Sequence, residues 1–208
     1  MRRISVLRFV TGFLLTCGLL FLLSCSKTPQ IAKLPSDGVV LAFGDSITFG
    51  TGAATAESYP SVLEKLIGRR VVNAGVPGEV TAEGRVRLVS VLDEYNPALM
   101  ILCLGGNDFL RHQDKNKTAE NLKAMISLAR SRGISVVLIS VPKLRLWLRV
   151  PKFYGELANE FAIPLEGKAL KQILSKRSLK SDAIHPNAAG YTILAESVAQ
   201  LLRNSGAL

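Results

Sequence analysis

Cysteine, histidine and tryptophan are scarce in this chain of 208 residues, which has three Cys, two His and one Trp. Cys17 and Cys25 lie in or directly after an apolar N-terminal segment, and only Cys103 lies further along. One remaining cysteine cannot form an internal disulfide, and two histidines cannot supply a Cys/His zinc site. We therefore expect no metal, and we expect Cys103 to be a small core residue.

Long hydrophobic runs are also lacking. The longest apolar segment, Phe9–Leu23, has 15 residues, whereas a transmembrane helix needs about 20. Three arginines and no acidic residue precede it. A short apolar run after a basic start is typical of a secretory signal peptide. The alternative is an uncleaved signal anchor.

The end of this segment, Leu22-Leu23-Ser24-Cys25, resembles the lipobox of bacterial lipoproteins, although Leu23 is less usual at its position. The resemblance implies lipidation at Cys25, and Ser26 after it implies export to the outer membrane, facing the periplasm. We expect a signal peptide over residues 1–24, a lipid-anchored tether over 25–37 and one domain over 38–208. The polar, proline-containing composition of the middle segment is typical of a tether.

The chain carries a formal net charge of +10, of which +7 remains from Cys25 onward. A basic protein can bind nucleic acid, but no nucleic-acid-binding motif is present in the sequence, and we expect no such partner. Anionic lipid head groups or glycans are the more plausible contacts of an exported protein. The simpler interpretation, a basic solvated surface without any partner, is the one we favour.

Apolar runs alternate with amphipathic segments from Val39 onward, which predicts a mostly parallel sheet covered by helices on both faces. The expected strands are Val39–Phe43, Arg70–Asn73, Ala98–Leu104, Ile134–Val141 and a short one near Ile163–Leu165. The expected helices are Ser58–Ile67, Thr81–Tyr95, Thr118–Arg132 and Asn187–Leu202. Within Thr81–Tyr95 the pattern places Val86, Val89 and Leu92 on the buried face.

A serine, a histidine and an aspartate occur in positions that suit nucleophilic catalysis. Ser46 follows the first expected strand, where open α/β folds bind ligands. His185 precedes the last expected helix, and Asp182 lies three residues before it, within reach of the imidazole ring. His112 lies in a polar stretch that is typical of a surface loop. A capped turn is the alternative for Asp182 and His185, and an ordinary turn is the alternative for Ser46.

Donors for an oxyanion are available at the same edge of the expected sheet. They are the backbone N–H of Ser46, the loop residue Gly78 after the second strand, and Asn107, which we expect to end the third strand. Glycine permits a close backbone approach, and an asparagine amide can donate a hydrogen bond. A turn that requires glycine and an Asx-turn are the alternatives for Gly78 and Asn107.

These residues resemble the SGNH/GDSL hydrolases, in four blocks that occur in the family's order. The blocks are Gly44-Asp45-Ser46, Gly78, Gly105-Gly106-Asn107-Asp108 and Asp182-Ala183-Ile184-His185-Pro186. The chain is most similar to the bacterial thioesterase, lysophospholipase and arylesterase branch. The resemblance implies a flavodoxin-like three-layer α/β/α fold with a five-stranded sheet and no cofactor. It implies Ser46 as nucleophile, His185 as base, Asp182 as its orienter, and Ser46, Gly78 and Asn107 as the oxyanion hole. We expect a monomer.

The resemblance therefore predicts a serine esterase that acts on small ester, thioester or lipid substrates through an acyl-enzyme. Asp45 is expected to support the loop. Two departures are Ile47, where many members have Leu, and Lys143–Phe153, which does not match the branch and leaves substrate choice open. Trp147, in that segment, is expected either to contact an acyl chain or membrane or to be a core residue. A non-catalytic envelope lipoprotein and an acyltransferase are the competing functions.

Overall fold

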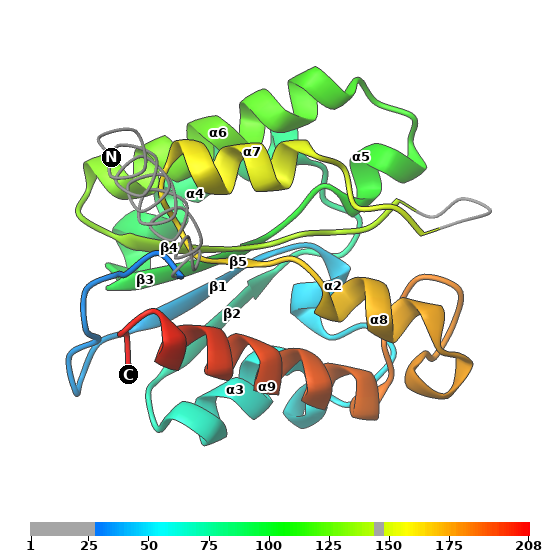
Figure 1. Cartoon of the computed structure of the whole chain (residues 1–208), viewed down its shortest axis with the longest axis horizontal. Coiled ribbons are helices and arrows are strands. Elements are labelled where there is room, and N and C mark those ends of the chain that lie inside the picture. The colour runs from blue at the N-terminus through cyan, green and yellow to red at the C-terminus, as the bar shows by residue number, and fades with distance from the viewer. Residues whose placement is uncertain (1–27, 144–147) are drawn as a thin grey trace, which may run out of the picture.

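A five-stranded parallel sheet forms the centre of the molecule in this computed structural model, which describes residues 28–143 and 148–208 (Figure 1). The strand order is β2-β1-β3-β4-β5. The strands are β1 (Val40–Gly44), β2 (Val71–Gly75), β3 (Leu99–Cys103), β4 (Ser135–Ile139) and β5 (Leu165–Glu166). All paired strands are parallel. The predicted strands are thus confirmed, each with shifts of one to a few residues at its ends.

The central strands are buried because both faces of the sheet are covered, and nearly every residue of β1 and β3 is apolar. Helices α3 and α9 pack together on one face, and α4 and α6 pack together on the other (Figure 1). Of the further helices, α7 packs against α6 and α8 packs against α9. The helices of the described residues are α2 (Ser46–Phe49), α3 (Tyr59–Ile67), α4 (Thr81–Tyr95), α5 (Gly106–Leu110), α6 (Lys115–Ser131), α7 (Phe153–Glu160), α8 (Ala169–Ser175) and α9 (Ala188–Asn204). This is the predicted three-layer α/β/α fold.

The buried face of α4 agrees with the prediction at Leu92, which is 2% exposed, and differs at two valines. Val86 is 78% exposed and Val89 is 44% exposed, whereas Leu88 is fully buried. Gly84 lies on the face that meets the sheet, where an added Cβ would lie 2.8 Å from the Leu104 side chain. The missing side chain of Gly84 lets the helix approach the sheet closely, so a small residue marks the contact face.

Residues that were expected to form the tether contact the domain. The backbone N–H of Ile31 donates to the carbonyl of Ser205, and that of Leu34 donates to the carbonyl of Ala207. The side chain of Leu34 is 3% exposed. This segment is therefore held against the C-terminal end of the chain. No helix within residues 28–143 and 148–208 is both long and apolar enough to cross a bilayer.

The segment after β4 contains an antiparallel contact between two of its own backbone positions. Lys143 and Arg149 form an isolated antiparallel bridge, in which the N–H of Lys143 donates to the Arg149 carbonyl over 2.8 Å. Residues 144–147, including Trp147, lie outside the described residues, so the expectation for Trp147 stays a prediction. Cys103, in contrast, is fully buried and unpaired, as predicted.

Candidate active site

The turn that carries Ser46 begins where β1 ends, at the carboxyl edge of the sheet. Gly44 lies so close to β3 that an added Cβ would be 2.2 Å from the Cys103 carbonyl oxygen, so only glycine fits. Asp45 caps the short helix α2, because its Oδ1 accepts a hydrogen bond from the Ile47 N–H over 3.1 Å. Ser46 is the first residue of that helix, so its own N–H has no partner within the helix.

Three side chains form a continuous hydrogen-bonded chain at this edge. The Oγ of Ser46 lies 2.9 Å from Nε2 of His185, although 139 positions separate the two residues. The Nδ1 of His185 lies 2.7 Å from Oδ2 of Asp182. A hydroxyl bonded to an imidazole, which is itself bonded to a carboxylate, is the arrangement that activates serine for nucleophilic attack. The structure thus brings together the three residues expected from the sequence.

The turn before α9 holds the carboxylate in place. The Oδ1 of Asp182 accepts hydrogen bonds from the backbone N–H groups of Ile184, over 2.7 Å, and His185, over 2.8 Å. Burial acts to raise the pKa of Asp182, but the hydrogen bonds from the His185 ring and these two N–H groups outweigh it and lower the pKa. Asp182 is therefore ionised at neutral pH and can stabilise a protonated His185.

Asn107 belongs to α5 and Gly78 lies on the loop after β2, and a hydrogen bond holds these two segments together. The Asn107 amide donates to the Glu79 carbonyl over 3.0 Å and lies 3.4 Å from Oδ2 of Asp45. Gly78 has a φ of +81°, in the region that favours glycine. Its carbonyl accepts a bond from Arg111, and none of the described backbone hydrogen bonds uses its N–H. Asn107 belongs to α5, so the prediction that it ends the third strand is wrong.

Buried polar groups that the sequence pattern did not predict support α5 and the loop that carries Gly78. Asp108 is fully buried, and its Oδ2 accepts from the Thr81 N–H over 2.9 Å, which ties α5 to the start of α4. Glu79 is 5% exposed and forms an ion pair with Arg87 at 2.6 Å. The Arg87 guanidinium also stacks over the Phe43 ring, 4.2 Å from its centroid. No periodic pattern marks these contacts, because the partners come from different elements.

Asp45 is a buried acid within the turn that carries Ser46. Burial raises its pKa to about 7, and the nearby carboxyl groups of Asp108 and Glu79 act in the same direction. The hydrogen bond from the Ile47 N–H opposes the rise. Asp45 therefore changes charge near neutral pH while it lies within 3.4 Å of the Asn107 amide.

This shift predicts a pH-dependent stability that Asp45→Asn removes. Below pH about 4 the carboxyl is protonated in both the folded and the unfolded chain, so its ionisation does not change the free energy of unfolding. Between pH about 4 and 7 only the unfolded chain releases the proton, which destabilises the fold progressively. The free energy of unfolding of the native protein, relative to Asp45→Asn, should fall by about 4 kcal/mol across this range. Chemical denaturation at several pH values measures it.

Asp37→Asn is the matched control, because Asp37 is exposed. It should leave the pH dependence of the native protein unchanged. A difference between the native protein and Asp45→Asn that is the same at pH 4 and pH 8 would contradict the assignment.

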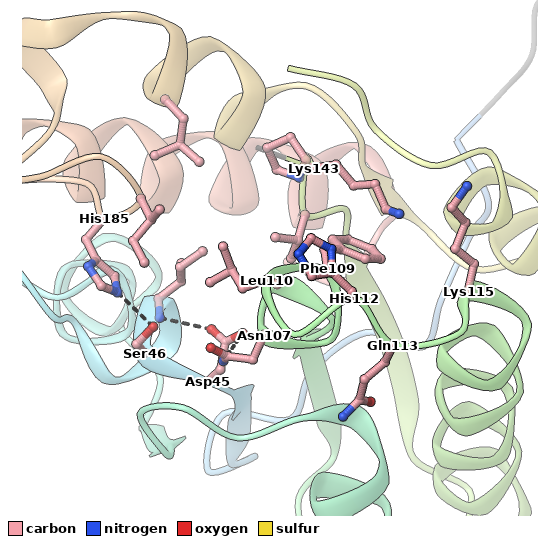
Figure 2. Close-up of a pocket in the computed structure, with 16 residues that line it drawn as sticks. Asp45, Ser46, Asn107, Phe109, Leu110, His112, Gln113, Lys115, Lys143 and His185 are labelled. Atoms are coloured by element: carbon pink, nitrogen blue, oxygen red, sulfur yellow. Dashed lines mark hydrogen bonds between the residues drawn. The ribbon is translucent and has the colours of Figure 1, made fainter. Parts of the chain in front are cut away.

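Ser46 and His185 open into a cavity of about 270 Å³ (Figure 2). Its walls are largely apolar, and polar and charged side chains lie at its two ends. The apolar lining residues are Ile47, Phe109, Leu110, Val141, Pro142, Leu174 and Ile184. The cavity is also lined by His112, whose φ is +55°, so the polar stretch interpreted as a surface loop reaches the site. Gly78 is not among the residues that line it.

The described residues contain no group of three or more His, Cys, Asp or Glu side chains placed to hold a metal ion. A serine, histidine and aspartate in contact at the carboxyl edge of a parallel α/β sheet define a serine hydrolase. The chain belongs to the GDSL-like Lipase/Acylhydrolase family, whose sequence profile matches residues 42–193.

Known relatives and solved structures agree with this family. The chain is 30% identical over 190 residues to Esterase TesA of Pseudomonas aeruginosa, which covers 86% of this chain and 94% of the relative. It is 30% identical over 181 residues to the Arylesterase of Vibrio mimicus, covering 78% and 87%. The crystal structure of TesA has a TM-score of 0.71 at 30% identity, covering 79% of this chain and 98% of that one. The SGNH-hydrolase family esterase AlinE4 has a TM-score of 0.64 at 29% identity, covering 83% and 98%. The protein is a carboxylic ester hydrolase, which disfavours the expected alternative of a non-catalytic lipoprotein.

Proposed function

We propose that Ser46 is the nucleophile of this esterase, His185 its general base and Asp182 the residue that orients the base. The observation that carries the proposal is the hydrogen-bonded chain from Ser46 Oγ through His185 to Asp182, at 2.9 and 2.7 Å. An Asp that accepts from Nδ1 holds the imidazole in the tautomer whose Nε2 can take the serine proton.

The proposed reaction has two halves. Ser46 Oγ attacks the carbonyl carbon of the ester or thioester while His185 takes the hydroxyl proton, and the tetrahedral intermediate collapses to an acyl-enzyme. The departing alcohol or thiol takes that proton from His185. A water molecule then attacks the acyl carbon, His185 removes its proton, and collapse of the second intermediate returns the proton to Ser46 and releases the acid.

Three donors are proposed to bind the oxyanion of these intermediates: the N–H groups of Ser46 and Gly78 and the amide of Asn107. The N–H of Ser46 begins α2, and no described backbone hydrogen bond uses that of Gly78. The bond from Asn107 to the Glu79 carbonyl at 3.0 Å joins α5 to the loop that carries Gly78. Their separation is thereby held before substrate arrives, which is what electrostatic stabilisation requires.

The apolar cavity beside Ser46 supports short acyl esters, aryl esters, thioesters or lysophospholipids as substrates. The relative from Escherichia coli K12, 26% identical over 179 residues, is named thioesterase 1/protease 1/lysophospholipase L1. A panel of esters and thioesters that varies acyl length and leaving group tests this range. We expect saturable hydrolysis of at least one series; no turnover of any member would contradict the proposal. Since all candidate residues come from one chain, we propose that a monomer is active.

We also propose that the protein is lipidated at Cys25 and held at the outer membrane facing the periplasm. The proposal is supported by the short apolar run before Cys25 and by Ser26 after it. Residues 1–24 would then be the cleaved signal peptide. Residues 1–27 lie outside the described part, and residues 31 and 34 are bonded to the C-terminal end.

Cys25→Ser should abolish incorporation of labelled palmitate in a Gram-negative host. The reason is that the thiol of Cys25 is the only atom at this position that can carry the thioether-linked lipid. Cys17→Ser is the matched control and should leave labelling intact. Equal labelling of Cys25→Ser and the native protein would overturn the assignment.

A further inference from the structure

The cavity beside Ser46 has a cationic end away from the nucleophile. Ser46 and His185 lie at one side of Figure 2, and Lys143 and Lys115 lie at the other, with Leu110 between them. Lys115 is the first residue of α6, and Lys143 follows the end of β4. Both lysines and the serine line one and the same cavity, so a single substrate can reach both ends.

The backbone positions of both lysines are held by the fold. The N–H of Lys143 is bonded to the Arg149 carbonyl, and its ammonium lies 4.7 Å from the centroid of the Phe109 ring, a wall of the cavity. Lys143 is half-buried and Lys115 is exposed. Lys115 forms no salt bridge with any carboxylate of the described residues. Its neighbour Asp114 is exposed and accepts bonds from the N–H groups of Asn116 and Lys117.

Positive charge dominates beyond the cavity as well. Lys115 and Lys143 also line an adjacent groove of about 540 Å³, together with Arg149 and Lys152, against a single carboxylate, Glu156. A further groove is lined by Arg149, Lys168 and Lys171, and none of its lining residues within the described part of the chain is acidic. Inside the cavity Asp45 is the one lining carboxyl, and it lies at the nucleophile end. Cations gathered around a cleft with apolar walls focus the field and attract anions.

We propose that this esterase selects substrates in which an apolar segment separates the reacting carbonyl from a phosphate or carboxylate group. The proposal rests on the proposed function of Ser46. Lys115 and Lys143 bind the anionic oxygens, and the side chains of Phe109, Leu110 and Val141 contact the apolar segment between. The positive field of the lysines around the cavity favours an anionic substrate over a neutral one of the same length.

Two matched pairs of substrates test the proposal and show which arm carries the anion. On the acyl side, mono-p-nitrophenyl adipate is compared with p-nitrophenyl hexanoate. On the alcohol side, 4-(octanoyloxy)butyl phosphate is compared with 4-hydroxybutyl octanoate. We expect kcat/KM to be about 10-fold higher for the charged member of at least one pair, the size that two partly exposed charge pairs can supply. Added salt should reduce the ratio.

The double variant Lys115→Gln/Lys143→Gln should bring that ratio close to one. The ratio is taken within each protein, so a general loss of activity cancels. Lys33→Gln/Lys65→Gln is the charge-matched control, because both lysines are exposed and line neither the cavity nor the two grooves. It should keep the native ratio.

Equal kcat/KM within both pairs for the native protein would overturn the inference while leaving the esterase proposal intact. So would a preference that survives in Lys115→Gln/Lys143→Gln, or one that the control variant loses equally. Failure of the native protein to hydrolyse any of the four substrates, neutral members included, would instead count against the proposed function and the inference together.

Discussion

Ser46→Ala is expected to lower kcat/KM for a p-nitrophenyl ester by about 10⁴-fold or more, because removal of the nucleophile of a serine triad costs that much. The variant loses the only oxygen that lies within hydrogen-bonding distance of His185 Nε2 among the described contacts. It keeps the Ser46 N–H, so part of the oxyanion site survives. The hydroxyl makes no other described bond, and the fold should be unchanged.

Ser90→Ala is the matched control, since Ser90 is an exposed residue of α4 whose hydroxyl bonds only its own helix. Both variants should unfold thermally within a few degrees of the native protein. Retention of more than about a tenth of native activity by Ser46→Ala, against an expected loss of this size, would show that another group performs the attack.

Asn107→Ala is expected to lower kcat by about 10²- to 10³-fold with little change in KM, because an oxyanion donor acts mainly in the transition state. The amide also donates to the Glu79 carbonyl, so some loss of stability should accompany the kinetic effect, about 1 kcal/mol. Steady-state kinetics on one ester, together with chemical denaturation, separates the two contributions.

Asn159→Ala, an exposed residue of α7, provides the control for asparagine removal and should behave as the native protein does. The oxyanion role of Asn107 would be wrong if Asn107→Ala kept native kcat and raised only KM. That outcome would assign the amide to substrate binding alone.

The sheet could be predicted from the sequence because its central strands have a simple sequence pattern. The runs around Leu41, Met100 and Val137 are almost wholly apolar, since strands covered on both faces need no polar residue. The helices α3, α6 and α9 show apolar residues at helical spacing because each buries one face against the rest of the domain. In α4 the apolar pattern predicted burial of two valines that are exposed, whereas Gly84, which has no apolar side chain, lies on the face that contacts the sheet.

The short helices were not predicted. α2 and α5 have only four and five residues, too few for a periodic pattern, and they are stabilised by contacts at the sheet edge instead. In α5 the buried Asp108 anchors the turn by accepting bonds from Thr81, which lies 27 positions earlier. A pairing between polar residues of different elements has no local signature in a single sequence.

The candidate site was predictable to a different degree for each part. Ser46, Asp182 and His185 follow from motifs whose order and spacing are specific. The cationic end of the cavity was not, because Lys115 and Lys143 come from elements that only the fold brings together. The same holds for Asp45, whose sequence position beside Ser46 does not reveal that it is buried near Glu79 and Asp108.

The covalent intermediate provides the most direct test of the central claim, that Ser46 receives the acyl group. The native protein is mixed with a p-nitrophenyl ester, quenched in acid within the first turnover, digested and mapped by mass spectrometry. We expect one acylated peptide, modified at Ser46, and no adduct in Ser46→Ala. An acyl group found on another residue, or rapid ester hydrolysis by Ser46→Ala, would contradict the account.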